Sequence, residues 1–163
     1  MVTSDAAFDP EPVDSTVTPD LLALENQVCF ALVVASRSVL SLYRPVLEPL
    51  GLTHPQYLVM LALWSQDERS AGDLATTLAL EPATLSPLLK RLETAGLVSR
   101  RRSEADERVL VVSLTESGRD LRRQAESIPQ QIVAQLGMAM DELASLRSSL
   151  HAVTAAAAAS PTP

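Results

Sequence analysis

The sequence predicts a mainly α-helical protein with one small β-hairpin, and three observations lead to this fold class. Apolar residues recur every three or four positions over most of the chain, as they do on one face of a helix. Two short helical patterns, separated by a tight break, occupy residues 70–95. A basic triplet at 100–102, a polar turn and a β-prone run at 108–114 follow. Helix, turn, helix and charged hairpin is the order of a winged helix-turn-helix fold, which makes duplex DNA the first partner to consider.

Charge is distributed unevenly along the chain. The net charge of −7 argues against non-specific binding of the whole molecule to polyanions. Residues 69–123 hold ten basic and eight acidic side chains, whereas the remainder holds three basic and twelve acidic ones. An acidic frame around a mildly basic middle suits a protein that finds one DNA site without adhering to nucleic acid in general.

Length, cysteine content and hydropathy limit the class of protein. The 163 residues, 47% of them hydrophobic, predict one domain with a sizeable core. The single cysteine excludes an intrachain disulfide and fits a reducing cytosol. No uninterrupted run of 18 apolar residues, signal-peptide pattern, metal-ligand cluster or glycine-rich phosphate loop is evident. We therefore expect a cytoplasmic protein without a membrane span, metal or cofactor.

The N-terminal part divides into an acidic lead and a long helix. Residues 1–19 are acidic, contain prolines and lack periodicity, which predicts disorder. A helix is expected from Asp20, a plausible N-cap, to about Leu50, with Pro45 and Pro49 kinking or ending it. This helix is apolar on most sides, which indicates burial between neighbouring helices. Its apolar residues are Leu21, Val28, Phe30, Leu32, Val33, Val34, Val39, Leu40, Leu42, Val46 and Leu50.

Two short helices are expected next. The first runs from Pro55 to about Trp64, because Thr53 can cap it and proline is favoured in a first turn. The second runs to Leu78, and the hydroxyl of Ser70 is its expected N-cap.

A third helix and the hairpin carry most of the basic residues. After a break at 80–82, the helix runs to about Ala95 and stops at Gly96, because glycine is suited to the position that follows a helix. Pro87 is tolerated easily only in a first turn, so the helix is expected to begin near Thr84. The strands of the hairpin are expected at 97–102 and 108–114.

Two more helices complete the chain, and together with the first helix they predict a homodimer. Thr115 caps one helix, and the other starts near Met138 and repeats apolar residues at the three- and four-residue spacing of a helix seam. The apolar residues of the two helices are Leu121, Ile128, Ile132 and Leu136, then Met140, Leu143, Leu146, Leu150 and Val153. The expected division is a lead (1–19), a dimerisation and sensing helix (20–52), a winged helix-turn-helix region (53–115), C-terminal dimerisation helices (116–158) and a tail (159–163).

Polar residues on the third short helix and the hairpin are candidates for DNA contact. Small hydroxyls near a helix N-terminus can enter the major groove, and lysine or arginine can reach base edges, although the same charges also suit a solvated face. Asp106 could orient the Arg108 guanidinium through a bidentate pair and so present it to the minor groove, or the two could form only a surface ion pair. The arginine triplet is expected on phosphates. The candidate DNA-binding residues are Ser70, Thr84, Ser86, Lys90, Arg91, Arg100, Arg101, Arg102, Asp106 and Arg108.

Several of these motifs resemble the MarR family of bacterial repressors. They are Leu88-Leu89-Lys90-Arg91-Leu92-Glu93-x-x-Gly96-Leu97-Val98 and Asp106-x-Arg108 followed by Leu114-Thr115. The resemblance covers about residues 26–123 and implies a dimeric winged helix-turn-helix protein on a pseudo-palindromic operator. It places Thr84, Ser86, Lys90 and Arg91 at the major groove and Arg108 in the minor groove. Within the family, residues 26–32, 43–45 and 50–58 are similar to the organic-hydroperoxide-sensing repressors called OhrR.

That resemblance implies that Cys29 is a peroxidatic thiol and that Tyr43 donates a hydrogen bond to its thiolate. A thiolate that attacks a peroxide becomes a sulfenic acid, and donors or positive charge nearby favour the thiolate. An apolar surrounding would favour organic peroxides over hydrogen peroxide. Fourteen residues separate Cys29 from Tyr43, or about 21 Å along a straight helix, so the two cannot meet within it. An antiparallel partner helix could instead bring Tyr43 of a second subunit to Cys29.

His54 stands where the OhrR branch is expected to have a second tyrosine. A neutral imidazole donates one hydrogen bond and a charged one favours a thiolate more strongly, so His54 preserves the function, shifts its pH dependence, or is only a helix-start residue. Tyr57 is either core or a substitute for the missing phenol. Without a second cysteine, oxidised Cys29 stays sulfenic, over-oxidises or is capped by a small cellular thiol. We expect the capped form to release DNA.

Three other functions remain open from the sequence. A MarR-type repressor could be released by a phenolic or lipophilic ligand, with Cys29 structural. A thiol peroxidase is weakly supported, because the chain offers no resolving cysteine, and we expect no enzyme. A winged-helix module used only for protein contacts would bind DNA without steep salt dependence, or not at all.

Overall fold

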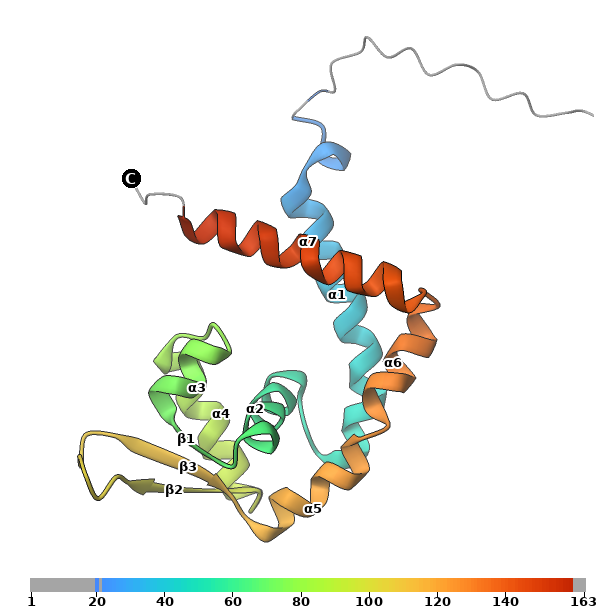
Figure 1. Cartoon of the computed structure of the whole chain (residues 1–163). Coiled ribbons are helices and arrows are strands. Elements are labelled where there is room, and N and C mark those ends of the chain that lie inside the picture. Colours follow the sequence, from blue (N-terminus) through green and yellow to red (C-terminus); the bar gives the residue numbers. More distant parts are fainter. Residues whose placement is uncertain (1–19, 21, 160–163) are drawn as a thin grey trace, which may run out of the picture. The chain divides into compact units, whose positions relative to one another are not determined.

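The computed structural model describes residues 20 and 22–159, so the lead at 1–19 and all but the first residue of the tail at 159–163 lie outside the described residues. The chain forms two compact units, one ending at Ser36 and one beginning at Arg37. Its elements are α1 (Val28–Leu47), α2 (His54–Ser65), β1 (Glu68–Ser70), α3 (Ala71–Thr77), α4 (Pro82–Thr94), β2 (Val98–Arg102), β3 (Leu110–Leu114), α5 (Glu116–Ala125), α6 (Ile128–Leu136) and α7 (Met140–Ala159) (Figure 1).

α1 begins later than predicted. Asp20 caps the short turn that precedes the helix, where its carboxylate accepts a hydrogen bond from the backbone N–H of Leu22 at 2.9 Å. Leu24–Asn26 form one 3-10 turn, but Gln27 has extended backbone angles, so the α-helix starts only at Val28. Pro45 lies in the last turn of α1, near the predicted end of the helix.

α2 and α3 have the predicted caps, and α2 begins at His54, one residue before its predicted start. The Thr53 and Gln56 side chains form a capping box at the start of α2, and the Ser70 hydroxyl accepts a hydrogen bond from the N–H of Asp73 at 3.0 Å at the start of α3. These caps satisfy N–H groups that have no partner within a helix, and they fix where each helix begins.

The predicted start of α4 near Thr84 is wrong. The helix begins at Pro82, because proline is suited to the first helical position, and Pro87 therefore falls in the second turn. The ring removes the N–H that would bond to the Ala83 carbonyl. Both Pro87 and Ala83 are exposed, so water can take the place of the lost bond.

The hairpin of β2 and β3 forms as predicted and gains a third strand. The antiparallel order is β1-β3-β2, with Arg69 opposite Val112 and Arg100 opposite Val112 on its other side. β1 was not predicted, since three residues are too few to show an alternating pattern. Asp67, which precedes β1, links this strand to β3 and α5. Its carboxylate accepts hydrogen bonds from the Leu114 N–H at 2.8 Å and from Arg119 Nε at 2.9 Å.

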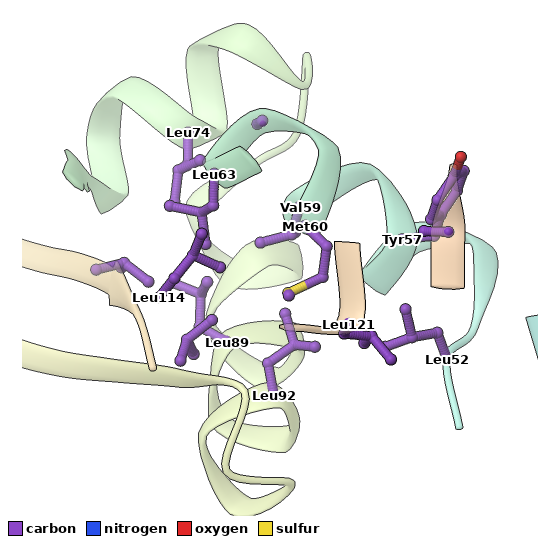
Figure 2. Packing of buried hydrophobic residues seen from close by; sticks show 14 of the residues in the cluster. Leu52, Tyr57, Val59, Met60, Leu63, Leu74, Leu89, Leu92, Leu114 and Leu121 are labelled. Carbon is purple, nitrogen blue, oxygen red and sulfur yellow. The ribbon is translucent and has the colours of Figure 1, made fainter. Parts of the chain in front are cut away.

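The core lies between the short helices and the sheet, with α2 at its centre. Val59, Met60 and Leu63 of α2 are fully buried, which explains why this helix is apolar on most sides. Figure 2 shows side chains from α3, α4, β3 and α5 gathered around them. The labelled neighbours are Leu74, Leu89, Leu92, Leu114 and Leu121.

The helix predicted after Thr115 is two helices. The Thr115 hydroxyl caps α5 as expected, accepting from the Gly118 N–H at 3.0 Å, but α5 ends at Ala125 and α6 starts at Ile128. Pro129 causes the break, because its ring conflicts with the carbonyl four residues earlier, that of Ala125.

α1 and α7 leave large apolar side chains exposed. Phe30 is 40% and Val28 66% exposed on α1, and Leu150 is 39% and Met140 69% exposed on α7. Among the described residues, Val28–Leu50 is also long and apolar enough to cross a membrane, by length and composition alone. The search of the sequence for 18 consecutive apolar residues did not find this segment, because polar residues interrupt it. Exposed apolar faces of this kind mark contact surfaces.

Candidate sensing site and DNA-binding surface

Three of the predicted sensing residues form one aromatic cluster. Tyr43 lies near the end of α1, His54 is the first residue of α2, and Tyr57 follows one turn later. The Tyr43 and His54 rings meet edge to face with centroids 4.7 Å apart, and the Tyr43 and Tyr57 centroids are 6.1 Å apart. The Thr53 capping box fixes the first turn of α2 and with it the position of His54. Edge-to-face packing of this kind favours a defined ring orientation.

Burial sets the protonation of this cluster. It lowers the pKa of His54 below 6.5 and raises the pKa of Tyr43 above 10.0. The pKa of Tyr57 is raised by burial and, to a smaller extent, by the nearby Tyr43. Neutral imidazole and neutral phenols are therefore favoured near pH 7, and each ring keeps a proton that it can donate. Of the two forms of His54 considered from the sequence, the structure favours the neutral one.

Trp64 extends the cluster and was missed in the sequence. Its ring meets that of Tyr57 edge to face at 6.2 Å, and its indole N–H donates to the Gly118 carbonyl in α5 at 2.8 Å. The signal was present, because residues seven apart in a helix, such as Tyr57 and Trp64, share one face. The cluster is thus joined directly to the helix that follows the sheet.

Cys29 lies in the first compact unit, whereas Tyr43, His54 and Tyr57 lie in the second. It is the second residue of α1, and its thiol is free and exposed. Its Sγ is 3.9 Å from Gln27 Oε1, a weak hydrogen bond.

The predicted major-groove residues are exposed on α4. Leu85, Leu88, Leu89 and Leu92 are buried on the opposite side of the helix, against the core. This burial leaves the polar side free, and the exposed predicted residues on it are Thr84, Ser86, Lys90 and Arg91. Ser70 differs from them: it is partly buried, and its hydroxyl serves as the N-cap of α3.

The predicted pairing of the Asp106 carboxylate with the Arg108 guanidinium is wrong. Asp106 Oδ1 instead accepts a hydrogen bond from the backbone N–H of Arg108 at 2.9 Å, and its carbonyl accepts from Val109 N–H at 2.9 Å. A short acidic side chain favours the backbone two residues on, which forms a local turn. Asp106 shapes the tip of the hairpin, and Arg108 is exposed there.

The three arginines of the triplet have three different partners in the structure, and their predicted phosphate contacts stay a prediction. Arg100 is paired with Glu93 of α4, with Nε 2.9 Å from the carboxylate, and the pKa of Glu93 is lowered mainly by this hydrogen bond. Arg101 is paired with Glu68 of β1 at 2.9 Å. Arg102 donates to the Arg108 carbonyl at 3.3 Å and is exposed. Arg100 thus fastens β2 to α4, which the sequence did not indicate.

A groove of about 450 Å³ lies beside the aromatic cluster. Leu40, Leu47 and Leu52 supply apolar lining, and Arg44 and His54 supply polar atoms. A second groove, of about 310 Å³, includes Tyr57 and Trp64 in its lining. Within the part of the chain that the structure describes, no group of three or more His, Cys, Asp or Glu side chains could hold a metal ion.

Comparison with known proteins defines the class of this molecule. Residues 41–124 match the family described as transcriptional regulator SarA/Rot. The organic hydroperoxide resistance transcriptional regulator of Bacillus subtilis is 41% identical over 132 residues, which cover 81% of this chain and 90% of that protein. Together with the three-stranded sheet and the exposed face of α4, these matches define a winged-helix, DNA-binding transcriptional regulator rather than an enzyme.

Solved structures agree with this class. Reduced AbfR bound to DNA, a protein of Staphylococcus epidermidis, is 34% identical with a TM-score of 0.67, covering 80% of this chain and 91% of that one. CouR bound to a 23-mer DNA duplex is 27% identical with a TM-score of 0.74, covering 85% and 99%. The chain belongs to the MarR-type winged-helix regulators, among which it is similar to the hydroperoxide resistance regulator.

Proposed function

We propose that the chain is a homodimeric repressor that binds a pseudo-palindromic operator and leaves it when organic hydroperoxides oxidise Cys29. The observation that carries the proposal is an exposed, free thiol in the first turn of α1, in a chain 41% identical to a hydroperoxide resistance regulator. The repressor would act in the cytoplasm, where its DNA lies. Ser70, Thr84, Ser86, Lys90, Arg91, Arg102 and Arg108 would contact DNA, with Arg100, Arg101 and Asp106 holding the surface in shape.

Dimerisation would complete the sensing site. Tyr43 and His54 are adjacent in one chain, and both favour the neutral form that donates hydrogen bonds. In an antiparallel pair of α1 helices, these donors of one subunit would serve Cys29 of the other. The exposed apolar residues of α1 and α7 would form the surrounding interface, which admits an alkyl peroxide more readily than hydrogen peroxide.

The chemistry requires one thiolate and one peroxide. The sulfur of Cys29 attacks the outer oxygen of the peroxide, the O–O bond breaks, and the alkoxide takes up a proton and leaves as an alcohol. The sulfur is oxidised to a sulfenic acid and the peroxide is reduced. A small cellular thiol then displaces water from the sulfenic acid and leaves a mixed disulfide. Its bulk within a packed interface would shift the helices that position α4.

A mobility-shift titration on the DNA upstream of the chain's own gene tests the proposal. Native protein and Cys29→Ser are compared with and without stoichiometric cumene hydroperoxide. Peroxide should release native protein, while Cys29→Ser, which has no oxidisable thiol, should stay bound. If peroxide released both proteins, or neither of them, oxidation of Cys29 would not be what controls DNA binding.

A second candidate function is release by a non-covalent phenolic or lipophilic ligand, with Cys29 structural. The groove of about 450 Å³ favours it, because leucine side chains line the groove together with the polar groups of Arg44, Glu48 and His54. In that case a phenolic acid would release native protein and Cys29→Ser equally.

A further inference from the structure

We propose that Pro87, together with Ala83 one turn before it, reads a thymine methyl group of the operator in the major groove. The inference rests on the proposed placement of α4 in that groove and deepens it by naming a base feature. Of the residues predicted to contact DNA, Thr84 alone carries a methyl group that could make such a contact, and it lies at the edge of the exposed face rather than in its middle.

The first observation is the position of these residues on α4. A residue advances about 100° around an α-helix, so Ala83, Pro87 and Lys90 lie along one line. The buried leucines of α4 occupy the opposite side, and all three residues of the line are exposed. The two apolar residues therefore lie in the middle of the free face, flanked by Thr84 and Ser86.

The second observation is that Pro87 lies within a helix although it is exposed and does not belong to the hydrophobic core. Proline is the least favourable residue within a helix, because it removes a backbone hydrogen bond and its ring crowds the preceding turn. Pro87 is exposed and is not part of the core cluster, so burial does not compensate for this loss. If α4 lies in the major groove, a contact between the rigid Pro87 ring and DNA would explain why a proline occupies this position.

The chemistry of the major groove indicates which base these two residues contact. Thymine is the base whose methyl group projects into the major groove, and small apolar side chains contact it. The Pro87 ring and the Ala83 methyl group have no donor for a base edge. Against the polar edges of other bases, these two side chains would leave hydrogen-bond donors and acceptors without partners. The thymine methyl group makes no hydrogen bond, so it loses none when the Pro87 ring and the Ala83 methyl group cover it.

The test replaces thymine by deoxyuridine, which lacks only the methyl group. The operator is first located by footprinting the DNA upstream of the chain's own gene. Duplexes of this operator are then made with each thymine replaced in turn, in both half-sites. Binding of reduced full-length protein to each duplex is measured by fluorescence anisotropy. Loss of one buried methyl contact should weaken binding about fourfold per half-site, hence about sixteenfold for the symmetric replacement. Pro87→Ser regains the backbone N–H and should fold, which circular dichroism checks.

In Pro87→Ser, the penalty for deoxyuridine at the sensitive position should fall to within about twofold, because the apolar partner of the methyl group is absent. Pro82→Ser is the matched control: Pro82 lines a small groove with α3 and β3, so this variant should keep the native penalty. An unchanged penalty in Pro87→Ser, or no sensitive thymine in native protein, would overturn the inference. Failure of native protein to bind any upstream duplex specifically would instead overturn the proposed function.

Discussion

At the scale of single residues, the protein uses partial burial to set protonation without a charged partner. His54 and Tyr43 meet edge to face at the junction of α1 and α2, and desolvation favours the neutral form of each ring. A neutral imidazole at the start of a helix also avoids the positive end of the helix dipole. His54 therefore offers the hydrogen-bond donor that a phenol would offer, but its proton count changes nearer to physiological pH.

This protonation predicts a pH-dependent stability difference between native protein and His54→Gln. The folded-state pKa of His54 lies below its ordinary value of 6.5, so above that value both states are neutral and the native contribution is complete. As pH falls below 6.5, the unfolded state binds the proton first, and the free energy of unfolding decreases. Urea unfolding at about pH 7.5 and about pH 5.5 should show native protein losing stability relative to the variant.

His151→Gln is the control for that measurement, because His151 is the other histidine of the chain and is exposed on α7. Its stability should follow that of native protein at both pH values. A gap between native protein and His54→Gln that stays constant with pH would show that burial does not perturb the imidazole.

At the scale of elements, close backbone approach decides where α5 lies. A Cβ built on Gly118 would lie 2.0 Å from the Leu97 carbonyl oxygen and 3.3 Å from a Leu114 methyl carbon. The Gly118 carbonyl also accepts a hydrogen bond from the indole N–H of Trp64 at 2.8 Å. A helix with a strongly polar outer face is thus held against the hairpin through a residue with no side chain.

Gly118→Ala should therefore destabilise the fold, although alanine is the better helix former. The methyl group cannot occupy the site unless α5 or the backbone at Leu97 moves, and overpacking of this kind costs about 1–3 kcal/mol. Gly72→Ala in α3 is the matched control, because the nearest atom to its added Cβ is 3.9 Å away. Thermal unfolding should show a lower Tm for the first variant and an equal or higher Tm for the second. Equal Tm values for Gly118→Ala and native protein would contradict the close packing of α5.

Most elements could be predicted because their signals are local. The caps Thr53, Ser70 and Thr115 mark helix starts through their own hydrogen bonds, and the hairpin follows from a short alternating run. The failures were β1, the start of α1, the start of α4 and the break between α5 and α6. β1 exists only because β3 pairs with it, and Pro87 in α4 is tolerated only because its side of the helix is exposed.

At the scale of the whole molecule, the main feature is the exposure of large apolar side chains on α1 and α7, which is unfavourable in water. Leu146, Leu150 and Val153 share one face of α7, each between 39% and 46% exposed. Apolar faces of this size mark an interface, and a second copy of the chain is the partner that the family offers. The same reasoning explains why Val28–Leu50 has the composition of a membrane span.

Leu150→Glu should shift the protein from dimer to monomer and weaken operator binding, because a carboxylate buried without a partner is costly. Ser148→Glu is the control, since Ser148 lies about 160° around the same helix from Leu150 and is exposed. Analytical ultracentrifugation should find monomers for the first variant and dimers for the second. A dimeric Leu150→Glu would place the interface elsewhere.

The sequence by itself determined the class of fold, the order of its helices and hairpin, and the residue types available for DNA and peroxide chemistry, because these depend on local periodicity, caps and short motifs. Only the tertiary structure decided which side chains meet. It joined Trp64 to Gly118, paired Arg100 with Glu93, turned Asp106 toward the backbone and brought His54 to Tyr43. These contacts depend on how separate elements pack and on competition between near and distant hydrogen-bond partners, which no local pattern records.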